Sequence, residues 1–407
     1  MRIYTITERY PSPYKSYFDT QFEQFLADGH SLRIYAADKQ GGTLEEKVRR
    51  LGLDRMTQYF PSTQKALPKC MGRMAVNFLK NPIWRLRAAG RVWSRRIGAK
   101  DGIMNIARML ILPEESPDLC LVHNLSVAAK FTFLKAVYPG APVSFYYHGG
   151  EVAGVPQVSP NAARRAFDSV DVIFTNTSNS REHAIARGAA ADRVVVCPVG
   201  FNISEFTPPE ERRYRQNGML NLLSIGRVSE EKGFIYALEA VKLLGQRGLK
   251  DVHYRLIGDG PLLGQLKAFV AENDLSAQVE FMGQVSRDAV YSALSEADVL
   301  ILPSIVLGTW QENQACVVQE AMLYKTLVVA TTTGGVPESL APELSRFSVR
   351  PADPKDIAEK IIDVCALSEN EMRTIGDAAR QFVVEGYDIK ALNKTIIDRS
   401  IEALEYR

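Results

Sequence analysis

The sequence predicts an α/β protein built from two doubly wound domains, each a parallel sheet wrapped by helices. Short runs rich in Val, Ile, Leu and Tyr alternate with helical patterns along the chain, which is typical of parallel sheets covered on both faces. A polar stretch at 202–218 interrupts this alternation, which then resumes. A chain of 407 residues is too long for one ordinary hydrophobic core and has the right length for two domains.

The apolar runs place the expected strands and domain bounds. The first half has candidate strands at 2–6, 31–35, 119–123, 143–148, 171–176 and 193–199, and the second at 220–225, 253–257, 279–282, 299–302 and 327–330. We expect domains at 1–201 and 202–386, and a final helix at 387–407 that crosses back toward the first domain. Ligands of such sheets bind at the carboxyl ends of the strands, here in a cleft between the domains.

Composition excludes several classes of protein. The net charge of +2, from 49 basic and 47 acidic residues, gives no case for nucleic-acid binding. Five cysteines without a Cys-x-x-Cys pair argue against a disulfide framework or a thiolate zinc site. No apolar run reaches the roughly 18 residues of a membrane span, and charges at Glu8 and Arg9 interrupt any signal-peptide core. We expect a cytoplasmic protein.

The first strand of the second half runs into a loop suited to phosphate binding. Residues 226–233 (GRVSEEKG) lie between that strand and a helix, where free backbone N–H groups attract anions. Arg227 and Lys232 add two cations able to neutralise a diphosphate. The alternative is a solvated loop that carries these two residues by chance.

The next strand ends in a second glycine-containing turn. Residues 258–261 (GDGP) permit a tight turn and a close backbone approach to a ligand. The spacing is not that of a dinucleotide fingerprint, and the turn at 7–14 after the first strand has no glycine. A hydride-transfer enzyme therefore loses support.

Two carboxylates stand eight residues apart after the strand at 299–302. The apolar pattern starts a helix near Gln314, which places Glu312 at its N-terminal mouth and Glu320 two turns inside. Helix N-termini attract phosphate, and carboxylates accept hydrogen bonds from sugar hydroxyls. The alternative is a capping acid and a solvated helical glutamate.

As an ordered set, these motifs resemble glycosyltransferase family 4. The set comprises GRVSEEKG, GDGP, EADVLILPS at 296–304, the Glu312 and Glu320 pair and GGVPE at 334–338. In the first half, FYYHGGE around His148 resembles the family's His-Gly element. The resemblance implies the GT-B fold, two Rossmann-like domains around a cleft, and sugar transfer from a nucleotide donor with retention of configuration.

The resemblance also implies a role for each matching residue. Arg227 and Lys232 would bind the donor diphosphate, Glu312 the donor sugar hydroxyls and Glu320 the nucleotide ribose. His148 would approach the transferred sugar from the opposite domain. Further donor contacts would come from Gly226, Gly260, Gln284, Val285, Asn313, Gln314 and Ala315, the last three through backbone amides.

The residues themselves favour a mechanism without metal. No Asp-x-Asp pair and no cluster at metal-ligand spacing occurs in the sequence, so fixed cations and dipoles must stabilise charge on the leaving diphosphate. We expect no cofactor, because the nucleotide sugar is a substrate. No carboxylate stands out as a covalent nucleophile, which favours same-face attack with the departing phosphate taking the acceptor proton.

A basic amphipathic segment lies in the first half. Residues 60–110 carry eleven basic residues against one acid, Asp101. Positions 83, 86, 90, 93 and 97 share one helical face, and we place Arg87, Arg91 and Arg95 on the opposite side, with Trp93 on the apolar face. Such a helix suits an anionic membrane surface. The alternatives are an ordinary amphipathic helix covering its own sheet, and nucleic-acid binding.

We therefore expect a cytoplasmic enzyme, peripheral at the inner face of the membrane, that transfers a hexose to a glycan. The donor expected is UDP-linked, with UDP-glucose a candidate, and the acceptor a lipid-linked glycan of surface polysaccharide. Two alternatives stay open. One is a retaining transferase with a small soluble acceptor, and the other is a sugar-nucleotide-binding protein without catalysis.

Overall fold

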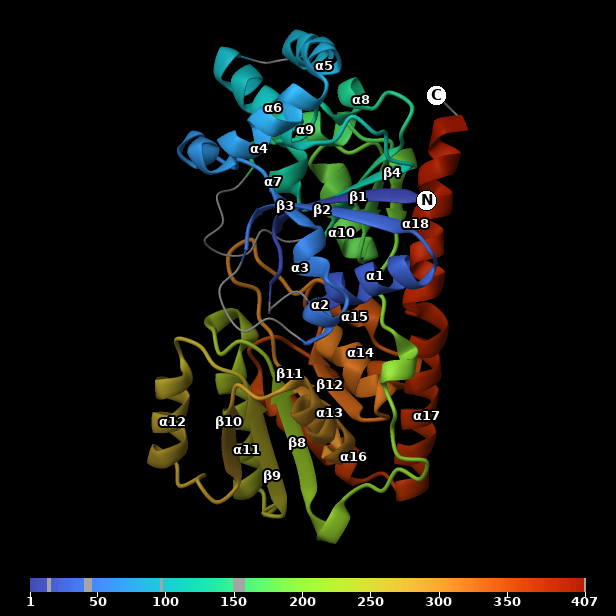
Figure 1. Cartoon of the computed structure of the whole chain (residues 1–407). Helices are drawn as coiled ribbons and strands as arrows, with labels where there is room; N and C mark the ends of the chain where they lie inside the picture. Colours follow the sequence, from blue (N-terminus) through green and yellow to red (C-terminus); the bar gives the residue numbers. More distant parts are fainter. Residues whose placement is uncertain (13–15, 40–45, 96–97, 149–157, 406–407) are drawn as a thin grey trace.

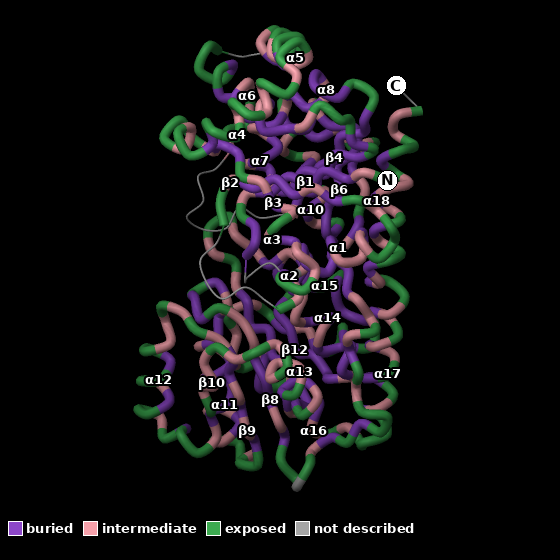
Figure 2. The backbone as a smooth tube through the Cα atoms, viewed as in Figure 1, coloured by how far each residue is buried: buried purple, intermediate pink, exposed green. Residues whose placement is uncertain are grey.

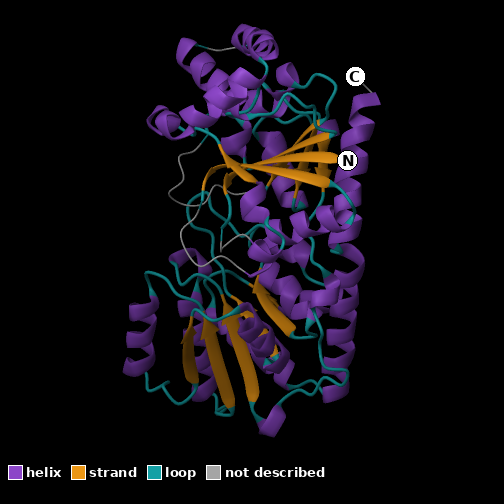
Figure 3. Ribbon diagram, in the orientation of Figure 1, coloured by secondary structure: helices purple, strands orange, loops and turns teal. Residues whose placement is uncertain are grey.

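The structure, a computed structural model, describes residues 1–12, 16–39, 46–95, 98–148 and 158–405. It contains two parallel sheets, one in the upper and one in the lower part of the molecule, each with helices packed against it (Figures 1 and 3). The predicted α/β fold with two doubly wound sheets is confirmed. We call residues before β8 the N-terminal half and those from β8 to α17 the C-terminal half.

The N-terminal sheet has seven strands in the order β3-β2-β1-β4-β5-β6-β7. Every pair in it is parallel. The strands are β1 (Arg2–Arg9), β2 (Ser31–Asp38), β3 (Thr57–Tyr59), β4 (Leu119–His123), β5 (Val143–Tyr147), β6 (Val172–Thr175) and β7 (Val194–Val196). The sequence did not predict β3, because three residues without an apolar run carry no periodic signal.

Ten α-helices of this half lie within the residues that the structure describes. They are α1 (Ser16–Ala27), α2 (Glu46–Arg50), α3 (Leu53–Met56), α4 (Leu67–Lys80), α5 (Pro82–Ser94), α6 (Ala99–Ile111), α7 (Leu125–Ala128), α8 (Leu134–Val137), α9 (Pro160–Asp168) and α10 (Ser178–Ala186). Strands β4 and β5 are buried along their whole length, as expected for parallel strands covered on both faces. Figure 2 shows this contrast between buried sheet and exposed helix surfaces.

The C-terminal sheet has six strands in the order β10-β9-β8-β11-β12-β13, again all parallel. Its strands are β8 (Leu220–Ile225), β9 (Val252–Ile257), β10 (Val279–Gly283), β11 (Val299–Leu302), β12 (Leu327–Thr331) and β13 (Ser348–Val349). Its helices are α11 (Phe234–Gln246), α12 (Leu263–Glu272), α13 (Arg287–Glu296), α14 (Cys316–Leu323), α15 (Val336–Ser339), α16 (Pro354–Cys365) and α17 (Glu369–Gly386).

The chain passes between the halves twice, and the two crossings lie side by side. The Phe201 N–H donates to the Tyr387 carbonyl oxygen at 2.8 Å, and the Ile389 N–H donates to the Phe201 carbonyl oxygen at 2.9 Å. A Cβ added at Gly200 would lie 2.8 Å from Cα of Ile389, so the crossing strands touch. The domain bounds proposed from the sequence, after 201 and after 386, fall at this pairing.

The last helix, α18 (Ile389–Glu405), packs on the N-terminal half (Figure 1). The buried side chain of Asn393 donates to the Gln21 carbonyl oxygen on α1 at 3.1 Å. Hydroxyls of Ser400 and Ser144, on β5, lie 2.7 Å apart. None of the described helices is long and apolar enough to cross a membrane, and all five cysteines are unpaired.

Candidate active site

The loops that follow β8, β9, β11 and β12 meet at the carboxyl ends of the C-terminal strands. A Cβ added at Gly258 would lie 1.8 Å from the Gly226 carbonyl oxygen, and one at Gly260 would lie 2.3 Å from the Val228 carbonyl oxygen. The glycines of GDGP are therefore required by contact with the neighbouring loop after β8. The structure shows this close approach to another backbone, and the approach to a ligand stays a prediction.

Lys232 and Glu312 form an ion pair between two of these loops. Nζ of Lys232 lies 2.6 Å from Oε2 of Glu312, and the Ser304 hydroxyl donates to the same oxygen at 2.9 Å. Nζ also lies 5.7 Å from the ring centroid of Trp310, within cation–π range. Among the described residues none donates to Oε1 of Glu312, so this oxygen can accept a hydrogen bond from a ligand. Ser304 ends the motif at 296–304, but no role was predicted for it from the sequence.

Arg227 is tied to a neighbouring carboxylate and is still open to solvent. Its guanidinium pairs with Oε1 of Glu231, which also accepts from the Ser229 hydroxyl at 2.7 Å. Burial raises the pKa of Glu231, but the hydrogen bonds from Ser229 and Arg227 outweigh it and lower the pKa overall. The Arg227 side chain is 57% exposed, against 22% for Lys232. Arg227 can thus meet an incoming anion.

Glu320 lies on α14 near cationic and phenolic groups. Burial lowers the pKa of Arg287, but Tyr291 and Glu320 raise it overall, so the guanidinium stays charged. Burial, followed by the charges of Glu320 and Glu312, raises the pKa of Cys316 to about 12, which keeps this thiol neutral. Glu320 itself is half-buried, and its charge acts on Arg287. Gln284 and Val285 follow β10 on the same edge of the sheet.

Helix α14 begins at Cys316, two residues later than predicted. The Gln314 side chain donates to the Val199 carbonyl oxygen at 2.9 Å and accepts from the Val199 N–H at 2.7 Å. These two bonds to the other half, with Ala315 at φ −82° and ψ 91°, keep the segment extended. Glu320 consequently lies about one turn inside the helix rather than two.

Asn313 also reaches across to the N-terminal half. Its side-chain oxygen accepts from the Thr177 hydroxyl at 2.6 Å and from Ser180, and its amide donates to the His148 carbonyl oxygen. The sequence assigned residues 313–315 to the donor through their backbone amides. The structure shows that the side chains of the first two hold the halves together.

Glu338, in the GGVPE motif, caps a helix of the opposite half. Its two carboxylate oxygens accept from the Ser178 N–H at 2.7 Å and the Asn179 N–H at 3.0 Å, at the start of α10. A Cβ at Gly335 would lie 2.6 Å from Cγ2 of Thr177, so this glycine allows the loop to approach. The sequence singled out the motif without finding this use of its carboxylate.

His148 lies where β5 ends, on the N-terminal side of these contacts. Its Nε2 is 3.1 Å from Nδ1 of His123, and its ring stacks on Tyr146 with centroids 4.5 Å apart. Its backbone oxygen is the acceptor for Asn313. Residue 149, the glycine of the predicted His-Gly element, lies outside the described residues, as do 13–14 of the loop after β1. The structure thus joins His148 to the predicted donor loops.

The predicted membrane residues lie far from this site, on α5, at the end of the molecule away from the C-terminal half (Figure 1). The face that packs inward carries Arg85, Ala88 and Val92, whereas positions 83, 86 and 90 of the predicted apolar face are exposed. Trp93 is half-buried, Arg87 and Arg95 are exposed, and Nε of Arg91 donates to the Ala136 carbonyl oxygen at 2.8 Å. The helix ends at Ser94, and position 97 lies outside the described residues.

Helices α4, α5 and α6 expose apolar side chains among basic ones, and we call this the basic apolar surface. The apolar members include Leu79 at 77% and Ile83 at 64% exposure; the others are Met71, Val76, Leu86 and Ile103. The exposed basic members are Lys65, Lys69, Arg73, Lys80, Arg87, Arg91, Arg95 and Lys100. Figure 2 shows exposed backbone over α4 and α5. Arg85 and Arg108 are buried and do not contribute.

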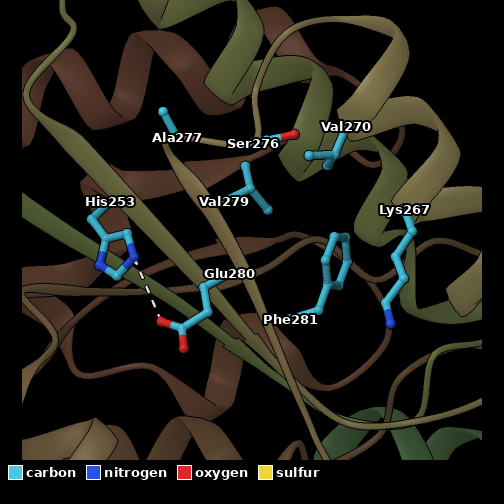
Figure 4. Close-up of a pocket in the computed structure, with 8 residues that line it drawn as sticks. All are labelled: His253, Lys267, Val270, Ser276, Ala277, Val279, Glu280 and Phe281. Carbon is cyan, nitrogen blue, oxygen red and sulfur yellow. Dashed lines mark ion pairs between the residues drawn. The ribbon is translucent and has the colours of Figure 1, made fainter.

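A cavity of about 490 Å³ lies elsewhere, along the edge strand β10 and helix α12 (Figure 4). In it His253 faces Glu280 with 3.6 Å between Nε2 and Oε2, and Lys267 extends beside Phe281. No residue of the candidate site lines this cavity. Within the described ranges, no three His, Cys, Asp or Glu residues gather in a way that could hold a metal ion.

Comparison with protein families matches both halves of the chain. The model described as glycosyl transferases group 1 matches residues 211–382, and the model described as glycosyl transferase 4-like domain matches residues 15–200. The first covers the loops after β8, β9, β11 and β12 described above, and the second covers most of the N-terminal sheet with His148. Together the two matches extend over most of the chain.

Two curated relatives come from bacterial polysaccharide synthesis. The putative colanic acid biosynthesis glycosyltransferase WcaL of Salmonella typhimurium is 27% identical over 212 residues, 51% of each chain. The amylovoran biosynthesis glycosyltransferase AmsK of Erwinia amylovora is 28% identical over 247 residues, 59% of this chain and 60% of that protein. The chain thus spans about half the length of the curated relatives it matches.

Among solved structures, Anabaena Alr3699/HepE in complex with UDP is similar over the full length of both chains. The TM-score is 0.71 at 17% sequence identity. At this identity the similarity shows a shared fold and nothing further. The same protein has also been solved in complex with UDP-glucose, at a TM-score of 0.67, with 98% of this chain and 99% of that one covered at 17% identity.

Proposed function

Because the chain belongs to the glycosyl transferases group 1 family and has the GT-B fold, we propose that it is a retaining glycosyltransferase. It transfers a hexose from a nucleotide sugar to a glycan. The observation that carries this proposal is the contact of Lys232 with Glu312 at the loop edge that also bears Arg227. The proposal assigns these two cations to the donor diphosphate and Glu312 to the donor sugar, with His148 approaching from the N-terminal half.

In this proposal the donor lies along the carboxyl edge of the C-terminal sheet. Its diphosphate meets Arg227 and Lys232, and the ribose hydroxyls meet Glu320. Oε1 of Glu312 accepts from a sugar hydroxyl, while Oε2 stays with Lys232 and Ser304. Gln284 and Val285 flank the base, and His148 approaches the sugar from the N-terminal half. UDP is the proposed nucleotide and UDP-glucose a candidate donor, supported by the HepE complexes.

The transfer itself needs charge stabilisation more than covalent chemistry. The acceptor oxygen forms a bond to the anomeric carbon as the bond from that carbon to the diphosphate oxygen breaks. The departing phosphate oxygen takes the acceptor proton on the same face, which retains configuration. Negative charge grows on the diphosphate, and preorganised cations such as Arg227 and Lys232 stabilise it in the transition state. We propose that no metal is required.

For the acceptor we propose a lipid-linked glycan of cell-surface polysaccharide, reached from the cytoplasmic face of the membrane. The printed names of WcaL and AmsK support polysaccharide synthesis. The basic apolar surface supports membrane contact, because exposed leucine and isoleucine side chains would enter the interface while lysine and arginine meet anionic headgroups.

The experiment that tests this function measures donor binding and transfer separately. A panel of nucleotide sugars is screened by thermal unfolding, where a donor at 100 times its Kd raises stability by about 2.7 kcal/mol. The stabilising donor is then incubated with the protein alone and with isolated lipid-linked or soluble glycans. Stabilisation with neither slow donor hydrolysis nor transfer would indicate a binding protein without catalysis. Transfer only to soluble acceptors would favour the soluble alternative.

A further inference from the structure

Two histidines meet at the carboxyl ends of neighbouring strands in the N-terminal half. His123 is the last residue of β4 and pairs in register with Tyr146 of β5, two residues before His148. Nδ1 of His123 lies 3.1 Å from Nε2 of His148, a hydrogen-bond distance. His123 has no exposed surface, whereas His148 is half-buried. The first histidine therefore reaches the site only through the second.

Aromatic side chains fix the planes of both rings. The two imidazoles stack at an angle of 13°, and the Tyr146 ring lies within 17° of the His123 plane and 10° of the His148 plane. The edge of Phe18 packs against His123 with centroids 4.7 Å apart, and Tyr17 packs against His148 at 5.2 Å. Neither ring can turn without displacing these neighbours.

We propose that His123 is a positioning residue for His148, an inference that rests on the proposed role of His148 at the donor sugar. A neutral imidazole carries one N–H, so the bond at Nε2 determines what Nδ1 offers. When Nε2 accepts from His123, Nδ1 of His148 bears the proton and donates. When Nε2 donates to His123, Nδ1 accepts. The bond thus sets the tautomer that His148 presents to the sugar.

The other end of His148 is held independently. The side chain of Asn313, from the C-terminal half, donates to its carbonyl oxygen. The backbone is thus held by one half and the ring by the other, which locates His148 at the point where the halves meet.

The kinetic test uses a double-mutant cycle with a conservative rescue. His123→Leu removes the bond, while His123→Asn keeps a polar atom near the position of Nδ1. We expect His123→Leu to lower kcat on the order of tenfold to a hundredfold with little change in donor KM, because misplacement acts on the transition state. His123→Asn restores most of this loss. In a His148→Ala background, His123→Leu changes kcat by less than about twofold.

Opposite results overturn the proposal. If His123→Leu multiplies the loss of His148→Ala, or if His123→Asn is as impaired as His123→Leu, then His123 does not act through His148. His253→Asn, at the cavity of Figure 4, is the matched control and keeps wild-type kcat. Thermal unfolding of each variant separates a loss of positioning from a loss of folded protein.

A spectroscopic test does not depend on activity. The chain has five histidines, so ring ¹⁵N signals are assigned by substitution, and they report each tautomer directly. We expect one tautomer of His148 in the wild type and a mixture in His123→Leu. An unchanged His148 spectrum in that variant refutes the positioning role. Absence of transfer in the wild type with the expected spectra refutes the proposed function instead.

Discussion

Nζ of Lys232 lies 2.6 Å from Oε2 of Glu312, so the cation proposed for the diphosphate and the carboxylate proposed for the sugar form one ion pair. Both side chains are largely shielded, at 22% and 10% exposure. Breaking such a pair from one side leaves a buried charge without its partner, which is strongly destabilising. For substitutions at these two residues, thermal stability therefore has to be measured as well as turnover.

We predict that Arg227→Ala and Lys232→Ala lower turnover more than nucleoside binding. Charge on the diphosphate grows toward the transition state, and losing one donor to it costs about 3 kcal/mol, or about a hundredfold in kcat. Lys232→Ala should also lower the melting temperature, because Glu312 loses its cation, and Arg227→Ala should lower it less, because the buried Glu231 keeps its hydrogen bond from Ser229. Steady-state kinetics and thermal unfolding measure both, with exposed Lys250→Ala as control. Wild-type turnover in either variant would remove the phosphate assignment.

The two glutamates are predicted to separate by role. Glu320→Ala weakens binding of the bare nucleotide, whereas Glu312→Gln leaves that affinity nearly intact and reduces transfer and affinity for the sugar-bearing donor. Glutamine is chosen because it still accepts from Ser304 while removing the charge. Calorimetric titration with nucleotide and with nucleotide sugar compares the two variants. Equal losses of nucleotide affinity would contradict the division.

Activity is predicted to survive removal of divalent metal. Arg227 and Lys232 already offset the charge of the diphosphate, so a metal ion has no essential role in the proposed step. The measurement is transfer rate with and without excess EDTA. If EDTA abolishes transfer and magnesium or manganese restores it, the metal-free mechanism is wrong.

Membrane binding is predicted to need both parts of the basic apolar surface. Reversing Arg73, Arg87 and Arg95 to Glu should abolish sedimentation with anionic liposomes, since each cation near such a surface contributes about 1 kcal/mol. Arg91 is left intact because it bonds Ala136. Leu79→Ser with Leu86→Ser should weaken binding without a large change in melting temperature, because both side chains are exposed.

Controls for the liposome assay use lysines outside the basic apolar surface. The triple variant Lys250→Glu, Lys267→Glu and Lys390→Glu makes the same charge change on other exposed positions. It should sediment like the wild type, and raised salt should reduce wild-type binding. Wild-type sedimentation of the Arg73, Arg87 and Arg95 variant would make a soluble acceptor the better proposal.

Glu338→Gln is predicted to loosen the contact between the halves. The carboxylate accepts two backbone N–H bonds at the start of α10, and hydrogen bonds to a charged group contribute about 1.5 to 3 kcal/mol. We expect a lower melting temperature, with the exposed Glu343→Gln unchanged as control. No change in Glu338→Gln would show that the remaining contacts of Asn313 and Gln314 suffice.

Local signals in the sequence predicted most of the sheet and the family. Strands β4, β8 and β11 have the predicted bounds, because buried parallel strands are continuous apolar runs. The motifs from Gly226 to Glu338 resembled glycosyltransferase family 4, and both family models confirm it. Short strands such as β3 were not predicted, because three residues are too few to show a hydrophobic run or a periodic pattern.

The amino-acid sequence alone indicates the series of strands and helices, the family and the loops at which charged residues follow strands. Which of those residues touch depends on how the chain folds. Folding joins Lys232 to Glu312 across 80 positions, turns Asn313 toward His148, and buries His123 beside that ring. The physical reason is that hydrophobic periodicity is a local property, whereas an ion pair or a shared proton depends on distances that exist only after two sheets have packed together.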